Sequence, residues 1–315
     1  MAIDDGGSPM KVLVTNDDGV ESVGLHALVR ALVGSGCDVV VAAPDRDMSG
    51  SGAAIGQIHM DEHIDAKPVD LPGLEGVPAY AVDGPPGLCV LAARLGGFGA
   101  VPDLVVSGIN PGCNTGRAVL HSGTVGAALT AANFGCKGIA VSIDVAARLL
   151  HEAAPRASTP VVDGGEATVE VVEAPEDAST GAEAGTAADR GSPRHWATAA
   201  QAAAAAVPWI VEAPRCTVLN INVPDRAAAA LAGARAATLA PFGTVRSTVV
   251  ESAEGGGRLQ LEMRRTDSEL PPGCDTALVA AGFVAVSAIT GVHLDDRVDV
   301  AGAVERVVAG AGGPP

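Results

Sequence analysis

The stretch KVLVTNDDGVESVGLHALVRALVGSGCDVVVAAP, residues 11–44, decides the fold. It opens with KVLVT (11–15), which is typical of a short buried strand, and closes with CDVVVAAP (37–44), a second such strand that ends at a proline. Between the two, apolar side chains recur at the spacing of a helix: Leu25, Leu28, Val29, Leu32 and Val33. The chain therefore begins as strand, loop, helix and strand.

The same alternation continues toward the C-terminus. Apolar segments predict further strands at 78–82, 102–108, 137–143 and 217–224, and amphipathic segments predict helices at 87–96, 122–135 and 195–213. Nearly continuous apolar strands between helices predict an α/β fold, a mostly parallel sheet with helices on both faces. Ligands bind such sheets at the carboxyl ends of strands, and polar loops follow three of these strands.

Composition limits the class of protein. Of 315 residues, 48% are hydrophobic, which excludes a wholly disordered chain. With 37 acidic and 20 basic residues the net charge is −17, so we expect neither a nucleic acid polymer nor a membrane as partner. Apolar stretches fall short of the roughly 20 residues that span a membrane, and MAIDDGGSPM is too acidic for a secretory signal. Six scattered cysteines without a CxxC spacing favour free thiols and a cytoplasmic location.

The first two thirds of the chain divide into a tail and an α/β domain. Residues 1–10 are predicted to be a disordered tail, and residues 11–225 to be the α/β domain. A flexible acidic insertion is predicted at about 155–194, because Val161–Asp189 holds eight acidic residues and no basic one.

The remaining part, residues 226–315, is predicted to be a C-terminal extension, an appendage to the sheet. Alternating apolar residues predict a hairpin that turns near 254–257, and a terminal helix is expected at about 295–309. This extension is interpreted as an oligomerisation region.

The loop Asn16-Asp17-Asp18-Gly19 follows the first strand. Its two adjacent carboxylates repel each other unless a cation or hydrogen-bond donors compensate, and carboxylate oxygen favours Mg²⁺, Mn²⁺ or Ca²⁺. A helix-capping turn explains the same residues equally well, since Asp and Asn cap helices and glycine suits a turn.

Three other segments fall at the same predicted edge. DRDMSGSG (45–52) supplies hydroxyl groups, SGINPGCNTG (107–116) supplies asparagine amides, and SGT (122–124) opens a helix whose free N–H groups suit an anion. Each alone is explained by an ordinary loop, turn or N-cap. Together with the aspartates they favour metal-assisted hydrolysis of a phosphate ester. The sequence has no GxxxxGK[ST] motif, and no GxGxxG follows the first strand.

Six motifs in combination resemble the SurE family of stationary-phase survival nucleotidases: VLVTNDDGVESVGLHAL, VVVAAPDRDMSGSG, PDLVVSGINPGCNTG, LHSGTVGAAL, GIAVS and LNINVP. The resemblance implies a Rossmann-like fold with a C-terminal extension that forms a homodimer or homotetramer. It also implies a 5'-nucleotidase, a divalent-metal-dependent phosphatase that hydrolyses nucleoside 5'- and 3'-monophosphates. Some members also act on short polyphosphate.

The resemblance also implies the site residues. The ligands of one Mg²⁺ or Mn²⁺ per subunit would be Asp17, Asp18, Ser49 and Asn110. The contacts to phosphate would be Asn16, Asn114, Ser122, Gly123 and Thr124. One of the two aspartates would also accept a proton from the attacking water.

Two departures from the family pattern keep alternatives open. Residues 84–89 read GPPGLC where members usually carry GTPxDC, and residues 53–56 read AAIG where many carry a polar residue followed by Ser-Ile/Leu-Thr. One alternative is a metal-dependent phosphatase for polyphosphate or another phosphomonoester. The other is a catalytically weak nucleotide-binding regulatory protein.

Overall fold

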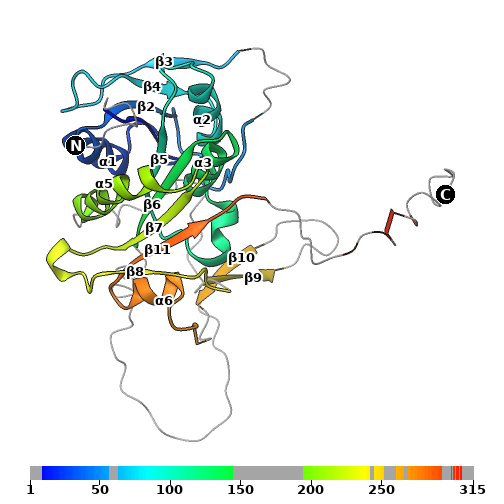
Figure 1. The fold of residues 1–315 in the computed structure, drawn as a ribbon. Coiled ribbons are helices and arrows are strands. Elements are labelled where there is room, and N and C mark those ends of the chain that lie inside the picture. The colour runs from blue at the N-terminus through cyan, green and yellow to red at the C-terminus, as the bar shows by residue number, and fades with distance from the viewer. Residues whose placement is uncertain are drawn as a thin grey trace, which may run out of the picture.

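The computed structural model describes residues 9–56, 63–144, 194–241, 245–251, 260–265 and 269–292, with residues 299, 301, 303, 304 and 306. Its main strands are β1 (Lys11–Thr15), β2 (Asp38–Pro44), β3 (Ala66–Pro68), β4 (Ala79–Val82), β5 (Leu104–Pro111), β6 (Lys137–Asp144), β7 (Val218–Pro224), β8 (Ala234–Ala236) and β11 (Val284–Ile289). Within the described residues these strands form one sheet, in the order β3-β4-β2-β1-β5-β6-β7-β11-β8 (Figure 1).

The sheet is covered on both faces because its central strands are apolar on both. In β1, Val12 and Val14 belong to the core on one side and Leu13 to the core on the other, and all three are fully buried. Burial of each such side chain stabilises the fold by roughly 1.5–3 kcal/mol. The helices α1 (Val23–Gly34) and α5 (Trp196–Glu212) pack on the first face, and α2 (Pro86–Arg94) and α3 (Gly123–Asn133) pack on the second (Figure 1).

The sheet grows outward from β1 in two directions. Strand β1 pairs in parallel with β2 on one side and with β5 on the other. Parallel pairing then continues from β2 to β4, and from β5 through β6 to β7. The carboxyl ends of β1, β2 and β5 therefore share one edge. Open α/β sheets bind ligands at such an edge, where the strand order reverses.

The predicted α/β pattern is confirmed, with one difference that concerns the site. The strand expected at 102–108 runs from Leu104 to Pro111, so Asn110 lies in β5 rather than in the following loop. Three short elements carry no local period that would predict them: β3, β8 and helix α6 (Asp275–Ala280). Pairing and packing with distant segments, not local pattern, place them.

Two strands beyond residue 225 belong to the sheet and are not an appendage to it. Strand β11 pairs antiparallel with β7, and β8 pairs in parallel with β11. The predicted hairpin is present as the antiparallel pair β9 (Val245–Glu251) and β10 (Gln260–Arg265), which forms a separate two-stranded sheet. The domain limits at 225 and the oligomerisation role of the C-terminal region stay predictions.

Several predicted segments lie largely outside the described residues. They are the tail at 1–10, the insertion at 155–194, the turn near 254–257 and most of the helix at 295–309, of which residues 301, 303, 304 and 306 are helical. The expectations for these segments stay predictions.

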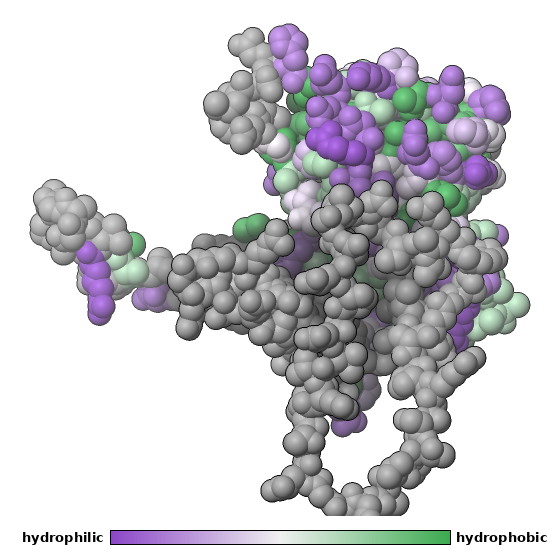
Figure 2. All heavy atoms as spheres, turned by 180° about the vertical axis from the view of Figure 1, so that it is seen from behind, coloured by the Kyte–Doolittle hydropathy of each residue, from purple (hydrophilic) through white to green (hydrophobic). Residues whose placement is uncertain are grey.

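The surface is mostly hydrophilic where the described residues can be seen from behind. Figure 2 shows hydrophilic side chains around scattered apolar ones at the end of the molecule that carries β3 and β4. None of the described helices combines the length and the apolar character that crossing a membrane requires. The six cysteines carry free thiols, and four of them are buried: Cys37, Cys89, Cys136 and Cys274.

Candidate metal and phosphate site

A cavity of about 520 Å³ opens at the carboxyl edge of the sheet, where β1, β2 and β5 end. Six residues that the sequence singles out line it: Asp17, Asp18, Ser49, Asn110, Asn114 and Ser122. They come from four separate segments, which the parallel order of the strands brings to one edge. The convergence expected from the loop positions is therefore present, whereas the roles of these residues stay predictions.

Asp17 is held between β1 and the start of α3. Its side chain is only 3% exposed, and its Oδ1 accepts a hydrogen bond from Thr124 Oγ1. Its carbonyl accepts the Met48 N–H at 2.7 Å, which ties the loop after β2 to the loop after β1. Burial raises the pKa of Asp17, while the Thr124 hydrogen bond acts in the opposite direction.

Asp18 has a buried oxygen without a partner. Its Oδ2 is buried and makes no hydrogen bond within the described structure. Burial, followed by the negative charges of Asp17 and Asp47, raises the pKa of Asp18 to about 8, and the positive charge of Arg194 partly offsets these effects. Ionising this carboxyl therefore costs free energy unless a further cation compensates its charge.

Strand β5 carries Asn110 into the site through an irregularity in its pairing. The register between β5 and β6 shifts between Ser107 and Asn110. At Gly108 the backbone has φ +129°, and a Cβ there would lie 2.2 Å from the carbonyl oxygen of Val141. Only glycine leaves room for this close contact between the backbones of β5 and β6. The irregularity changes the direction in which the end of β5 runs. The amide of Asn110 is fixed by a 2.6 Å hydrogen bond from Nδ2 to the Gly112 carbonyl.

Asn114 is fixed by a network that the sequence alone does not reveal. Its N–H donates to Asn222 Oδ1 at 2.8 Å, and its Nδ2 donates to Ser142 Oγ at 2.8 Å. Its carbonyl accepts from the amides of Asn220 and Asn222 at 2.8 and 3.0 Å. The two asparagines of β7 therefore hold Asn114 in place. The sequence marks LNINVP as a strand and as one of the six family motifs, but it does not reveal this network.

The start of α3 presents its N-terminus to the cavity. Ser122 is the N-cap, with its Oγ accepting the Val125 N–H at 3.0 Å. A Cβ on Gly123 would lie 2.8 Å from Asp17 Oδ2, so the absence of a side chain lets the helix backbone approach the carboxylate. Free N–H groups at a helix start favour a bound anion.

Three predicted contacts do not line the cavity itself. Asn16 is fully buried, and its Nδ2 donates to the Gly19 carbonyl at 3.0 Å and to Ser22 Oγ at 2.7 Å, so it organises the first loop. Gly123 and Thr124 lie against Asp17 but are not among the residues that line the cavity.

Five lining residues are absent from the sequence-based set: Asp47, Gly50, Pro111, Ala118 and His121. His121 ends the 3₁₀ helix Gly116–His121 and is exposed. Its position directly before the SGT motif is the one sequence signal that could have pointed to it.

The two departures from the family pattern lie against each other. A Cβ on Gly87 of α2 would lie 2.5 Å from the Ala54 carbonyl oxygen, so the segments 53–56 and 84–89 are in contact. Pro85 is the N-cap of α2, and Leu88 is buried beside Gly84. The two altered segments pack so closely at Gly87 and Ala54 that a side chain at position 87 has no room.

The donor set at this edge fits a divalent cation. The unpartnered Asp18 Oδ2 lies among carboxylate, hydroxyl and amide oxygens, which are hard ligands. Neither Lys nor Arg is among the described residues that line the cavity. The described residues hold no cluster of three His, Cys, Asp or Glu side chains suited to a metal. The fit therefore rests on two carboxylates combined with neutral oxygens.

Comparison with known proteins identifies the family and the fold of the chain. A family model described as Survival protein SurE matches residues 12–243. The chain belongs to the SurE family. The solved SurE protein from Aquifex aeolicus shares the fold, with a TM-score of 0.64 at 23% identity over 94% of this chain and 99% of that chain.

Curated SurE relatives match the chain over a shorter stretch. A protein named 5'-nucleotidase SurE from Xylella fastidiosa (strain M12) is 43% identical over 134 residues, which are 42% of this chain and 48% of that protein. The 5'-nucleotidase SurE 1 of Thermus thermophilus is 44% identical over 142 residues, 45% of this chain and 54% of that protein. The matched stretch thus spans about half the length of these SurE relatives.

Proposed function

We propose that this protein is a divalent-metal-dependent phosphatase that hydrolyses nucleoside 5'- and 3'-monophosphates to nucleoside and phosphate. The observation that carries the proposal is the meeting of Asp17, Asp18, Ser49 and Asn110 in one cavity beside the N-terminus of α3. The names of the curated relatives, 5'-nucleotidase SurE, support the substrate class.

The proposed ligands of the cation are Asp17, Asp18, Ser49 and Asn110. A bound Mg²⁺ or Mn²⁺ would supply positive charge that offsets the phosphate and polarises its P–O bonds. The phosphate oxygens would accept hydrogen bonds at the start of α3, where Ser122 lines the cavity, and from Asn114, whose backbone the β7 asparagines hold in place.

Hydrolysis needs one proton removed and one delivered. A water oxygen forms a new bond to phosphorus, its proton passes to Asp17 or Asp18, and the ester P–O bond breaks. The departing alkoxide of the nucleoside then takes a proton. Among the described residues that line the cavity, His121 is the one imidazole, the side-chain type that most often acts as a general acid, and it is the proposed donor of that proton.

The setting of the enzyme belongs to the same proposal. We expect a cytoplasmic homodimer or homotetramer with one metal ion per subunit, acting on a small-molecule nucleotide and on neither nucleic acid polymers nor membranes. The net charge of −17 supports the last point, because a surface of this sign repels polyanions.

The contact between the segments 53–56 and 84–89 favours a second candidate, a metal-dependent phosphatase for polyphosphate or another phosphomonoester. These segments lack the hydroxyl and carboxylate that the family pattern carries, and they lie packed together. The regulatory nucleotide binder has no comparable observation in its favour, and it becomes an outcome of the experiment.

The test is phosphate release from a panel of nucleoside 5'- and 3'-monophosphates, short polyphosphate and p-nitrophenyl phosphate, each in Mn²⁺, in Mg²⁺ and in EDTA. The proposal predicts metal-dependent release that is fastest from nucleotides. Fastest release from polyphosphate would favour the second candidate. Tight nucleotide binding without release from any substrate would replace the enzyme with a binder.

A further inference from the structure

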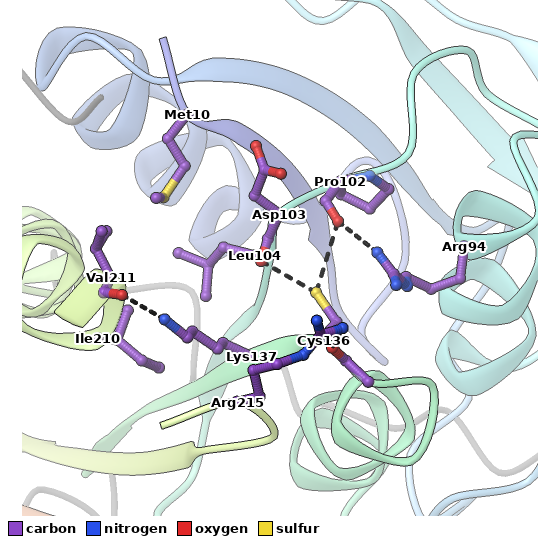
Figure 3. A pocket seen from close by; sticks show the side chains of 11 residues that line it. Met10, Arg94, Pro102, Asp103, Leu104, Cys136, Lys137, Ile210, Val211 and Arg215 are labelled. Atoms are coloured by element: carbon purple, nitrogen blue, oxygen red, sulfur yellow. Dashed lines mark hydrogen bonds between the residues drawn. The ribbon is translucent and has the colours of Figure 1, made fainter. Parts of the chain in front are cut away.

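A second cavity, of about 500 Å³, lies at the opposite edge of the sheet, beside the amino ends of β5 and β6 (Figure 3). Strand β5 connects the two sites, since Leu104 at its start lines this cavity and Asn110 near its end lines the candidate active site. We call it the basic cavity, because its lining includes Arg94, Lys137 and Arg215.

Each of the three cations is anchored by backbone carbonyl groups. Arg94 donates from Nη1 to Pro102 O at 2.6 Å and from Nη2 to Phe134 O at 3.1 Å. Lys137 Nζ donates to Val211 O, and Arg215 Nη2 donates to Gly135 O at 3.3 Å. Figure 3 shows Arg94 extending toward Pro102 and Lys137 extending toward Val211. Carbonyl groups fix the positions of the cationic heads but bring no full negative charge to them.

The charge balance of the basic cavity is opposite to that of the whole protein. One carboxylate, Asp103, faces three cations, and its Oδ2 already accepts the Lys11 N–H at 3.1 Å. None of the three cations forms a salt bridge with a carboxylate of the described residues. In a chain with net charge −17, this is an unusual local excess of positive charge.

Arg94 also points to a missing acceptor. Its Nε is buried and has no hydrogen-bond partner in the described structure. A buried N–H group without a partner is costly, so the hydrogen-bonding capacity of Arg94 is not used up by the two carbonyl groups. Two guanidinium groups and an ammonium group offer several donors, which suits an anion with several oxygens and more than one negative charge.

We propose that the basic cavity binds a phosphate group, either free inorganic phosphate or the phosphate of a small molecule. The site is separate from the candidate active site and does not depend on its chemistry. The same cations also lie at the C-terminal ends of α3 and α5, so a purely structural role as helix caps is the competing explanation.

The test is isothermal titration calorimetry of the full chain with inorganic phosphate, AMP and adenosine, all in EDTA. Without metal, the carboxylates of the candidate active site disfavour anions there. The test variant is the double substitution Lys137→Gln and Arg215→Gln. The matched control is Arg30→Gln with Lys67→Gln, two exposed cations outside both cavities whose loss changes the net charge equally.

The proposal predicts that phosphate and AMP bind the wild type and the control, that adenosine does not, and that the test variant binds about tenfold more weakly or worse. Arg94→Lys, which keeps the charge but loses the planar fork, should weaken binding too. Absence of phosphate binding to the wild type would overturn the proposal, as would equal binding by test and control variants. If the double variant does not fold, as judged by circular dichroism, Arg94→Lys and Arg215→Gln alone decide by the same criterion.

Discussion

At the scale of single residues, Asp18 makes the stability of the metal-free protein depend on pH. Its pKa lies near 8 in the folded chain against 3.8 for an ordinary aspartate, mainly because it is buried. The folded state therefore keeps a proton that the unfolded state has already lost, and the metal-free protein loses stability as pH rises from about 4 to about 8. We expect Asp18→Asn to raise the Tm of the metal-free protein at pH 8 and to leave it unchanged at pH 4, in calorimetric scans.

The control for this prediction is Asp38→Asn, an exposed carboxyl at the start of β2 that should not alter the pH dependence. A metal-free wild type whose Tm falls with pH no more steeply than that of Asp18→Asn would show that folding does not raise the pKa of Asp18.

His121 gives a second prediction at this scale. A proton donor matters for an alkoxide leaving group and hardly at all for p-nitrophenolate, which is stable as an anion. His121→Gln should therefore lower turnover of AMP roughly 10²–10⁴-fold and leave that of p-nitrophenyl phosphate nearly unchanged. Leu120→Ala, next to it and 75% exposed, is the control. Equal losses on both substrates would assign His121 to binding rather than to proton transfer.

At the scale of elements, the irregularity in β5 positions the site. Gly108→Ala would place a Cβ 2.2 Å from the Val141 carbonyl oxygen at a φ of +129°. We expect a loss of about 1–3 kcal/mol in unfolding free energy, measured with urea, and a loss of AMP turnover as Asn110 shifts. Gly34→Ala, where no atom lies within 4 Å, should change stability by less than about 1 kcal/mol. Similar small effects at both glycines would show that β5 tolerates a side chain here.

The elements also show what a sequence can and cannot predict. Strands such as β1 and helices such as α1 were predictable because their apolar spacing is local. The membership of β11 in the sheet was not, because it depends on pairing with β7, which lies far away in sequence. The site follows the same division: the loops that end strands predicted Asp17 and Asn110, whereas the parts played by His121 and the β7 asparagines depend on contacts with distant segments.

At the scale of the whole molecule, the predicted acidic insertion is expected to be dispensable, because of its position between two elements and its composition. Asp144 ends β6 and Trp196 begins α5, so the predicted insertion enters between two elements of the fold. Its composition, eight acidic residues and no basic one in Val161–Asp189, is that of a solvated segment. Deletion of Val161–Asp189 should leave AMP turnover and Tm largely unchanged. A large fall in either would mean that the segment packs against the fold.

The whole molecule also separates the two proposed anion sites by the length of a strand. The candidate active site lies at the carboxyl edge, where α3 begins, and the basic cavity lies at the amino edge, where α3 ends. If both bind phosphate, metal dependence distinguishes them, because the basic cavity brings its own cations and the active-site cavity does not.

The central claim is that Asp17 and Asp18 hold a metal that drives hydrolysis of a nucleotide. The most direct measurement is phosphate release from AMP by the wild type, Asp17→Asn and Asp38→Asn, each in saturating Mn²⁺ and in EDTA. The account predicts Mn²⁺-dependent release by the wild type and Asp38→Asn, and about a thousandfold less from a folded Asp17→Asn. Near-wild-type release by Asp17→Asn, or release by the wild type in EDTA, would contradict it.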